Sequence, residues 1–361
     1  MRMPATRLGM STTDLAFLGL ALFMNTFTAP AVKITQEEDG SYAYNKYSIY
    51  FVAEFIKLAV AGGWAAYTYT TEPEVRKLMV VTTRDVWQYA IPGFIFFVQN
   101  NLSFIALQHI SNAGFQLLLN MRIAAVGVLT VTLLGKKLNK LKWIAIGLLT
   151  VGSMQYELAG CSNDGGLKTD VEGLMVMGIL ITTAAAGNVV TQLVMQKNMD
   201  QPLMFQNMLL YSWGVIFNGI NWFYSVSSSR ATDKPVEWFG GGFGQAAVLL
   251  CVFNAIYGLS ISVILKRFGS LPRTFISCMA IISNAFLDKI FFGETMSILV
   301  LTTFAIILGG IYLFTIVGEE YGKLEEEKKS NADKAEDQQL TLKINNILDN
   351  GDEGPGSPRK D

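Results

Sequence analysis

A single arginine, Arg122, lies near the middle of the apolar stretch GFQLLLNMRIAAVGVLTVTLLG, residues 114–135. A guanidinium stays protonated at physiological pH, and at the centre of a bilayer it costs at least about 2.5 kcal/mol. No acidic residue lies at helical spacing within this stretch to neutralise the charge. Because phosphate groups accept paired hydrogen bonds from guanidinium, Arg122 is a candidate ligand for a bound anion.

Other polar side chains also occur inside or beside apolar segments. Glu54 and Lys57 lie three residues apart in AEFIKL and therefore share one face of a helix. They could form a structural ion pair or contact a substrate, and the sequence leaves both readings open. The remaining polar groups are Gln99, Asn100, Asn101, Gln116, Asn188, Thr191, Asn207, Asn254, Ser262 and Asn284, with Lys266, Arg267 and Arg273 around one helix junction. Amides of this kind either tie helices together or read a base edge or a sugar hydroxyl.

The composition predicts a membrane protein. The chain has 361 residues, of which 51% are hydrophobic and 16% charged, whereas soluble domains have about 25% charged residues. Apolar runs of about 20 residues are long enough to span a bilayer. We expect an all-α integral membrane protein with ten transmembrane helices over 12–32, 46–68, 87–108, 112–134, 141–158, 171–194, 203–225, 243–265, 272–291 and 296–317.

The distribution of lysine and arginine predicts the orientation, because short cytosolic loops carry an excess of them. Basic residues gather in alternate connections, for example around 136–142 and 266–273. Both termini should therefore be cytosolic, with residues 1–11 as the N-terminal segment and 159–170 as a lumenal linker. Residues 318–361 are charged and rich in Gly, Pro and Asp towards the end, which predicts a largely disordered cytosolic tail.

An internal repeat favours two halves, 12–158 and 171–317. A shift of 158 positions aligns LLGKKLNKLKWIAIGLLTVGSMQY, residues 133–156, with FFGETMSILVLTTFAIILGGIYLF, residues 291–314. In this alignment Gly135 matches Gly293 and Gly152 matches Gly310. With five spans in each half, the second copy enters the membrane inverted, and transporters built this way bind near the midplane between the halves. Arg122 from one half and Arg273 from the other could then hold one phosphorylated ligand.

Several other classes of function are excluded by the sequence. The net charge of −1 and the absence of one basic patch give no indication of a nucleic-acid partner. Three scattered cysteines and one histidine indicate neither a disulfide framework nor a metal site. There is no Gly-rich phosphate loop, nucleophile elbow or metal triad, so we expect no enzyme activity and no cofactor.

Two stretches carry a family resemblance. VQNNLSFIALQHISNAGFQLLLNMRI, followed by LLGKKLNKLKWIAIGLLTVG, resembles the third to fifth helices of the nucleotide-sugar transporters, in the branch that carries CMP-sialic acid, UDP-galactose and UDP-N-acetylglucosamine. AEFIKL and YGLSISVILKRFGSLPRTF are similar to that family's second helix and its eighth-to-ninth helix junction. The resemblance implies the drug/metabolite transporter fold and a Golgi antiporter that exchanges a cytosolic nucleotide sugar for a lumenal nucleoside monophosphate.

The resemblance also implies a set of binding residues. The positions that match the family's nucleotide contacts, together with the neighbouring glutamine and the junction lysine, are Asn100, Phe115, Gln116, Arg122, Asn207, Lys266 and Arg273. Supporting polar positions inside the membrane are Glu54, Lys57, Gln99, Asn101, Asn188 and Ser262. The chain departs from the family at Phe115, where a tyrosine is usual, and at Ala124, where a proline is usual. These departures leave the base and the sugar unspecified.

Three alternatives stay open at this stage. A related carrier of phosphorylated metabolites would keep the same fold. A scaffold or regulator with the transporter fold but no transport activity would also be compatible with the charged tail. A membrane-embedded transferase would need an acid at the midplane, where Glu54 is available. The sequence does not separate the Golgi from the endoplasmic reticulum, and it leaves a homodimer open.

Overall fold

The computed structural model describes residues 12–33, 35, 44–110, 112–161, 171–229, 239, 243–292, 298–328, 330 and 341. These residues form helices joined by turns, with no strand among them. The helices are α1 (Thr12–Lys33), α2 (Lys46–Thr71), α3 (Pro73–Arg76), α4 (Thr83–His109), α5 (Asn112–Leu119), α6 (Arg122–Leu134), α7 (Lys140–Cys161), α8 (Val171–Lys197), α9 (Leu203–Ser229), α10 (Gln245–Arg267), α11 (Ser270–Phe292) and α12 (Ile298–Tyr312), which continues into the π-helical turn Leu313–Val317. Residues 1–11, 162–170 and most of 331–361 lie outside the described residues, and with them the predicted N-terminal segment, most of the linker and most of the tail.

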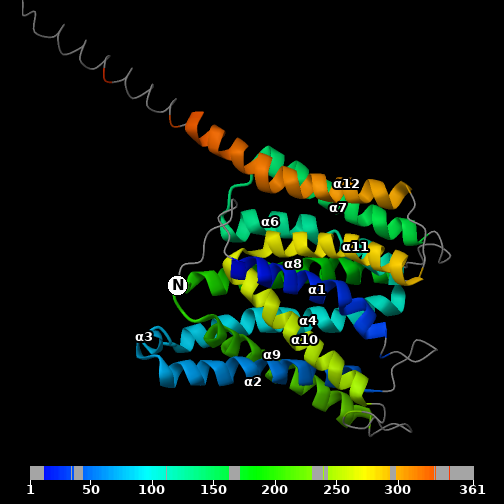
Figure 1. The fold of residues 1–361 in the computed structure, drawn as a ribbon. Coiled ribbons are helices and arrows are strands. Elements are labelled where there is room, and N and C mark those ends of the chain that lie inside the picture. The colour runs from blue at the N-terminus through cyan, green and yellow to red at the C-terminus, as the bar shows by residue number, and fades with distance from the viewer. Residues whose placement is uncertain are drawn as a thin grey trace, which may run out of the picture.

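The long helices lie side by side in one bundle (Figure 1). The α7–α12 pair forms one edge of the bundle, the α2–α9 pair forms the other, and α8 lies between them. Two apolar clusters follow this division: one joins α6, α7, α8, α11 and α12, and the other joins α2, α4, α8 and α9. Since α8 contributes to both clusters, it is the central packing element of the bundle.

Six helical segments in the described part of the chain are long and apolar enough to cross a membrane. They are Tyr47–Thr71, Gly114–Leu134, Val171–Lys197, Gln245–Arg267, Ser270–Leu287 and Ile298–Lys328. Large apolar side chains are also exposed on the outside of the bundle, among them Trp64, Tyr224, Leu249 and Ile290. Exposed apolar surface on this scale suits contact with lipid. The long apolar helices and the exposed apolar surface thus support the prediction of an all-helical membrane protein.

The expected fourth span, 112–134, is interrupted. Asn120 and Met121 form a turn between α5 and α6. The Met121 N–H donates to the carbonyl three residues earlier, at 3.0 Å, which is the spacing of a tight 3₁₀ turn. The Asn120 side-chain amide donates to the Ser153 backbone carbonyl on α7 at 3.4 Å. Arg122 therefore begins a helix instead of lying in the middle of one.

Glycines determine how closely α7 and α12 pack. A Cβ atom built on Gly152 would lie 2.8 Å from Ile306 Cγ2 and 3.4 Å from Ile307 Cγ1, and one built on Gly310 would lie 3.0 Å from Leu149 Cγ. The two contacts are reciprocal, because Gly152 and Gly310, like Leu149 and Ile307, are 158 positions apart. Small residues allow helix backbones to approach closely in membranes, where van der Waals packing drives helix association.

The α2–α9 pair has the same kind of reciprocal contact. Gly62 packs against Met208, and Gly219 packs against Phe51, at Cβ distances of 3.7 and 3.1 Å. Gly62 and Gly219, like Phe51 and Met208, are 157 positions apart. Two separate helix pairs therefore repeat their contacts at almost the same sequence offset.

We expect Gly152→Ala to lower the thermal unfolding midpoint of the purified protein. The added methyl group would overlap Ile306, whose β-branched side chain has little rotamer freedom in a helix. Overpacking costs about 1–3 kcal/mol, more than the roughly 1 kcal/mol gained from the better helix propensity of alanine. Gly147→Ala is the matched control on α7, because a Cβ there meets no atom within 4 Å. Equal midpoints for the two variants would contradict the close packing described here.

Candidate functional site

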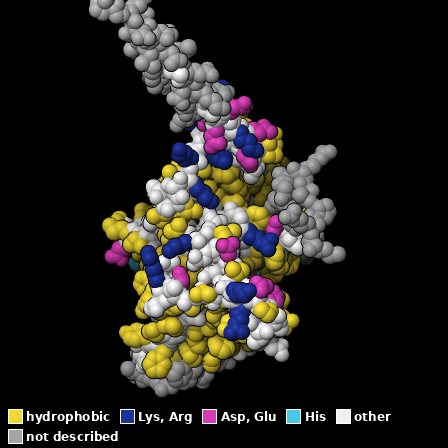
Figure 2. Space-filling view, turned by 90° about the vertical axis from the view of Figure 1, so that its left-hand side faces the viewer, with side chains coloured by type: hydrophobic (Ala, Val, Ile, Leu, Met, Phe, Trp, Pro, Cys, Tyr) yellow, Lys and Arg dark blue, Asp and Glu magenta, His cyan; other side chains and the backbone are white. Residues whose placement is uncertain are grey.

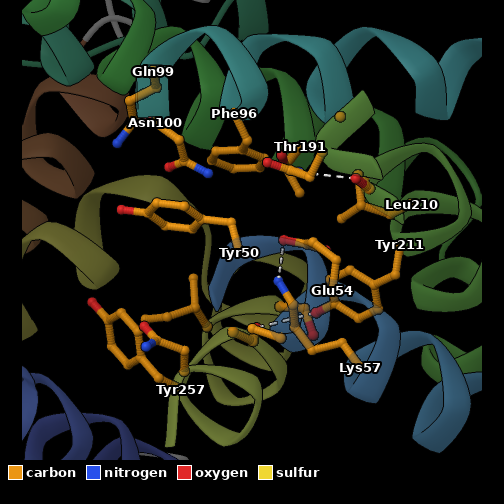
Figure 3. Close-up of a pocket in the computed structure, with 18 of the residues that line it drawn as sticks. Tyr50, Glu54, Lys57, Phe96, Gln99, Asn100, Thr191, Leu210, Tyr211 and Tyr257 are labelled. Carbon is orange, nitrogen blue, oxygen red and sulfur yellow. Dashed lines mark hydrogen bonds and ion pairs between the residues drawn. The ribbon is translucent and has the colours of Figure 1, made fainter. Parts of the chain in front are cut away.

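A cavity of about 210 Å³ lies between α2, α4, α8, α9, α10 and α11 (Figure 3). Both halves of the chain contribute to its wall. The lining residues are Tyr50, Ala53, Glu54, Lys57, Gly93, Phe96, Gln99, Asn100, Asn188, Thr191, Leu210, Tyr211, Gly214, Asn218, Asn254, Tyr257, Gly258, Ile261, Ser262, Leu265 and Arg273. Seven of the thirteen predicted binding and supporting residues thus lie around one cavity, although they come from five helices.

The Glu54–Lys57 pair forms one side of the cavity. Lys57 Nζ lies 2.5 Å from Glu54 Oε1 and 4.6 Å from the centre of the Tyr211 ring (Figure 3). The Tyr211 hydroxyl in turn donates to the Gly258 backbone carbonyl at 3.2 Å. The ion pair that the sequence left as one of two readings is therefore present. It also faces the cavity, so the two readings are compatible.

Two glycines make room for this ion pair. A Cβ atom on Gly214 would lie 2.5 Å from Glu54 Oε2, and one on Gly258 would lie 2.8 Å from Lys57 Cδ. Both glycines are on the second half of the chain, whereas the ion pair is on α2. A buried ion pair keeps its stability only with good geometry, so these two positions determine where the charges lie.

Amide and hydroxyl groups form another part of the wall. Asn188, Asn218 and Asn254 each donate from the side-chain amide to the carbonyl one helical turn earlier, at 2.9–3.0 Å. This bond uses the nitrogen and leaves each side-chain oxygen as an acceptor. Gln99 Oε1 is buried and has no hydrogen-bond partner among the described residues. The cavity therefore presents several acceptors to a ligand that carries hydroxyl or amine donors.

The positive charge at the cavity comes from two arginines. Arg273 reaches it from α11, and its Nε atom is buried without a partner in the described part of the chain. Arg122 does not line the cavity, but it lies close enough to Arg273 and to the lining residue Tyr257 to interact electrostatically with both. Neither arginine pairs with an acid among the residues that the structure describes. Because Lys57 already neutralises Glu54, the site has a net positive charge and suits an anion.

The α10–α11 junction holds Arg273 in position. Gly269 has a φ angle of +96°, which favours glycine, and the chain turns there into α11. Gln192 on α8 accepts a hydrogen bond from the Ser270 N–H at 2.7 Å and donates to Gln196 at 2.9 Å. Gln196 then donates to the Lys266 carbonyl at 3.0 Å. This pair of glutamines connects the first turn of α11 to the central helix.

Other residues expected from the sequence lie away from the cavity. Asn207 is directly behind the wall, where its amide donates to the lining Ser262 hydroxyl at 2.8 Å. Lys266 donates to the Gln201 backbone carbonyl at 2.5 Å, near the α8–α9 connection. Asn101 ties α4 to α9 by accepting from the Asn221 amide at 2.8 Å.

Phe115 and Gln116, on α5, also lie outside the lining. Phe115 is buried in an apolar cluster with Ala106, Met177 and Leu180. Gln116 is exposed on the surface of the bundle. One of these neighbours is buried and the other is exposed, and neither lies with the charged groups of the cavity.

Aromatic residues of the cavity were missed by the sequence reasoning. Tyr50, Phe96 and Tyr257 line it, and Figure 3 shows the Tyr50 and Phe96 rings close to Asn100. Each is three or four residues from a polar position that was noted: Tyr50 precedes Glu54 by four, and Phe96 precedes Gln99 by three. Helical spacing from those positions would have found them.

Comparison with known proteins identifies the family. A model of the family described as "Nucleotide-sugar transporter" matches residues 11–315. The chain belongs to the nucleotide-sugar transporter family. The resemblance seen in the sequence is confirmed, and since the family consists of transporters, the chain is a transmembrane nucleotide-sugar transporter in class and not an enzyme.

Curated relatives have modest sequence identity to this chain. CMP-sialic acid transporter 1 of Arabidopsis thaliana is 25% identical over 278 residues, covering 76% of this chain and 81% of the relative. The UDP-galactose transporter senju of Drosophila melanogaster is 23% identical over 342 residues, covering 84% and 87%. A solved crystal structure aligns with a TM-score of 0.63 at 15% identity, covering 86% of this chain and 99% of that one, and it supports the fold alone.

We expect Gly214→Ala to displace the Glu54 carboxylate and break its pair with Lys57. Because the Lys57 and Glu54 side chains are only 12% and 16% exposed, separating the two charges is unfavourable, and uptake of nucleotide sugars by reconstituted protein should fall by at least about tenfold. Gly63→Ala is the control on α2, because a Cβ there meets open space. Uptake at the wild-type rate by Gly214→Ala would show that the position of the pair does not matter for transport.

Proposed function

We propose that the protein is an antiporter that moves a pyrimidine nucleotide sugar from the cytosol into the Golgi lumen in exchange for the nucleoside monophosphate. The substrate would belong to the UDP-galactose, UDP-N-acetylglucosamine or CMP-sialic acid class. The observation that carries the proposal is the pair of arginines without described acid partners beside a cavity between the two halves. The names of relatives that carry CMP-sialic acid and UDP-galactose support the substrate class.

The phosphate would bind between Arg122 and Arg273. Two guanidinium groups that interact electrostatically repel each other when no anion lies between them, and a phosphate would convert this repulsion into attraction. The unpartnered Arg273 Nε supplies a donor that a phosphate oxygen could accept. Arg122 also begins α6, and the first turn of a helix favours negative charge.

The base and the sugar would occupy different walls of the cavity. Tyr50 and Phe96 offer aromatic faces on which a base could stack, and Asn100 lies beside them with an amide that can read a base edge. On the other side, Glu54 and Lys57 present an acceptor and a donor next to Tyr211. Hydroxyl groups of a sugar need both kinds of group, so we place the sugar at this pair, between α2 and α9.

An exchange mechanism follows from the shared chemistry of the two ligands. A nucleoside monophosphate has the same base, ribose and proximal phosphate as the nucleotide sugar. One set of contacts at Arg122, Arg273 and the aromatic wall can therefore hold either of them. When the cavity is empty, the two arginines repel each other, which favours movement between the two membrane faces with a ligand bound.

A ten-helix architecture of two inverted repeats is part of the proposal. The reciprocal glycine contacts at offsets of 157 and 158 support it, because an exchange of the two halves reproduces them. The helix pairs support it as well: α4 with α8 corresponds to α10 with α1, and α6 with α8 corresponds to α11 with α1. Rocking of one half against the other around the cavity would give alternating access.

The basic end of the bundle would face the cytosol, together with both termini. In the described part of the chain, basic residues lie in or beside alternate connections between helices: Arg76 in α3, Lys136 after α6, and Lys197 and Arg267 at the ends of α8 and α10. Figure 2 shows Lys and Arg side chains across this end, with hydrophobic side chains at its margin. Cytosolic loops are enriched in such residues.

Exchange in vesicles tests the proposed function. The protein is reconstituted in vesicles preloaded with UMP, CMP or GMP, and uptake of a panel of labelled nucleotide sugars is measured. We expect uptake to exceed that of unloaded vesicles for one pyrimidine monophosphate and its matching sugars. No stimulated uptake of any nucleotide sugar would contradict the antiport and favour a scaffold or regulator with this fold. GMP is the internal control for the base.

Substitution of Arg122 tests the phosphate site. Loss of a charge-assisted contact of about 1.5–3 kcal/mol should reduce exchange by Arg122→Ala at least about tenfold. Arg122→Lys keeps the charge and should retain much more activity. The unliganded Arg122→Ala protein should unfold at a midpoint no lower than the wild type, because one of two repelling charges is gone.

Arg84→Ala serves as the control for this series, since Arg84 is exposed at the start of α4, away from the cavity. Exchange at the wild-type rate by Arg122→Ala would show that this arginine has only a structural role. A large drop in the unfolding midpoint of the unliganded variant would point to the same conclusion.

A further inference from the structure

A second cavity, of about 220 Å³, lies at the basic end of the bundle. It opens beside the α6–α7 loop and reaches the first turn of α11. Lys136, Lys137 and Lys142 line it together with the hydroxyl-bearing residues Thr130 and Ser270. No aspartate or glutamate is among the described residues that line it. Three lysines thus line one hollow.

The lysines of this cavity have little compensation from acids. Among the described residues, Lys136 and Lys137 form no ion pair, and Lys142 Nζ lies 5.4 Å from the centre of the Phe314 ring. The nearby Glu319 is engaged elsewhere, with its Oε1 at 3.2 Å from Lys323 Nζ. Partial desolvation lowers the pKa of Lys136, and no described carboxylate raises it again. A bound anion would supply the missing negative charge.

The polar groups of Ser270 and Thr130, which line the cavity, already have hydrogen-bond partners within the protein. The Ser270 N–H donates to Gln192 at 2.7 Å, and the Ser270 and Thr130 hydroxyl oxygens lie 3.5 Å apart. At the rim, the Asn139 side chain accepts from the Lys142 N–H at 2.9 Å. The groups left to bind a ligand are therefore the lysine ammonium groups, which suit a ligand with several negatively charged oxygens.

The surroundings of the cavity favour a lipid as the source of these oxygens. Trp143 and Ile144, at the start of α7, are 38% and 54% exposed, and Leu148 follows on the same helix with 38%. This apolar strip begins directly beside Lys142. Tryptophan concentrates where headgroups meet acyl chains. Basic pockets between helix ends at this depth are suited to phospholipid headgroups.

We propose that this cavity binds the phosphate-bearing headgroup of an anionic phospholipid, with the acyl chains lying along α7. The site is separate from the nucleotide cavity, since Ser270 and Pro272 line the one and Arg273 lines the other. The two cavities share the first turn of α11. The proposal rests on the membrane location of the chain and not on the exchange mechanism.

Binding to the full-length protein in detergent tests the site. Short-chain phosphatidylinositol monophosphate is titrated in 0.15 M salt, with short-chain phosphatidylcholine, a soluble inositol phosphate and inorganic phosphate as comparison probes. We expect the anionic lipid to raise the unfolding midpoint of the wild-type protein, because a ligand that binds only the folded state stabilises it. In the Lys136→Gln/Lys137→Gln/Lys142→Gln variant, affinity for the anionic lipid should fall at least about tenfold.

The matched control removes three other lysines, none of which lines the cavity, as Lys77→Gln/Lys140→Gln/Lys197→Gln, and should keep the wild-type affinity. If both triple variants lost the same affinity for the anionic lipid, general surface charge would explain the binding, and the proposed site would be wrong. If inositol phosphate or inorganic phosphate raised the unfolding midpoint as much as the anionic lipid does, the cavity would bind free phosphates, and a lipid ligand would be contradicted. No shift with the lipid would overturn the proposal. Stabilisation by nucleoside monophosphates, which tests the other cavity, should be unchanged in both variants.

If the cavity variant unfolds without lipid, the single substitutions Lys136→Gln and Lys142→Gln replace it. Each should weaken binding of the anionic lipid by about fivefold, since one ammonium near the membrane surface contributes about 1 kcal/mol. Unchanged affinity in both single variants would also contradict the site.

Discussion

The repulsion between Arg122 and Arg273 is the constraint on which the central site depends. Two permanent charges of the same sign lie within electrostatic range of each other in a low-dielectric bundle, and no described acid pairs with either. Such an arrangement is unfavourable unless an anion completes it. The turn at Asn120 and Met121 brings one arginine to the start of α6, and the Gln192 contact fixes the first turn of α11 that carries the other.

Glycine contacts determine how closely the helix pairs at the two edges of the bundle pack. Close approach at Gly152 and Gly310 joins α7 to α12, and Gly62 and Gly219 do the same for α2 and α9. At Gly214 the space left by the missing side chain is used differently, because it holds the Glu54 carboxylate. The same residue type thus provides packing at the edges of the bundle and room for polar groups at its centre.

Charge also organises the basic end of the molecule, but in another way. The lysine of the central cavity differs from those of the second cavity in its partner. Lys57 is paired with Glu54, whereas Lys136 and Lys137 form no ion pair with a described acid. Because the charges of Glu54 and Lys57 cancel, the net positive charge of the central site comes from the two arginines. The unpaired lysines make the second cavity attractive to anions of the membrane surface.

The sequence by itself determined the helical class, the membrane environment and the family, because long apolar runs and the polar motifs within them are local properties of the chain. It also indicated that Glu54 and Lys57 share one helix face, since helical spacing fixes which residues share a face, whereas the ion pair between them was one of two readings. Only the tertiary structure decided which polar positions share a cavity: Asn100 and Arg273 line it, whereas Phe115 is in an apolar core and Asn101 ties two helices. Helical periodicity gives the face of each helix but not its neighbours, and contacts between residues distant in sequence depend on packing.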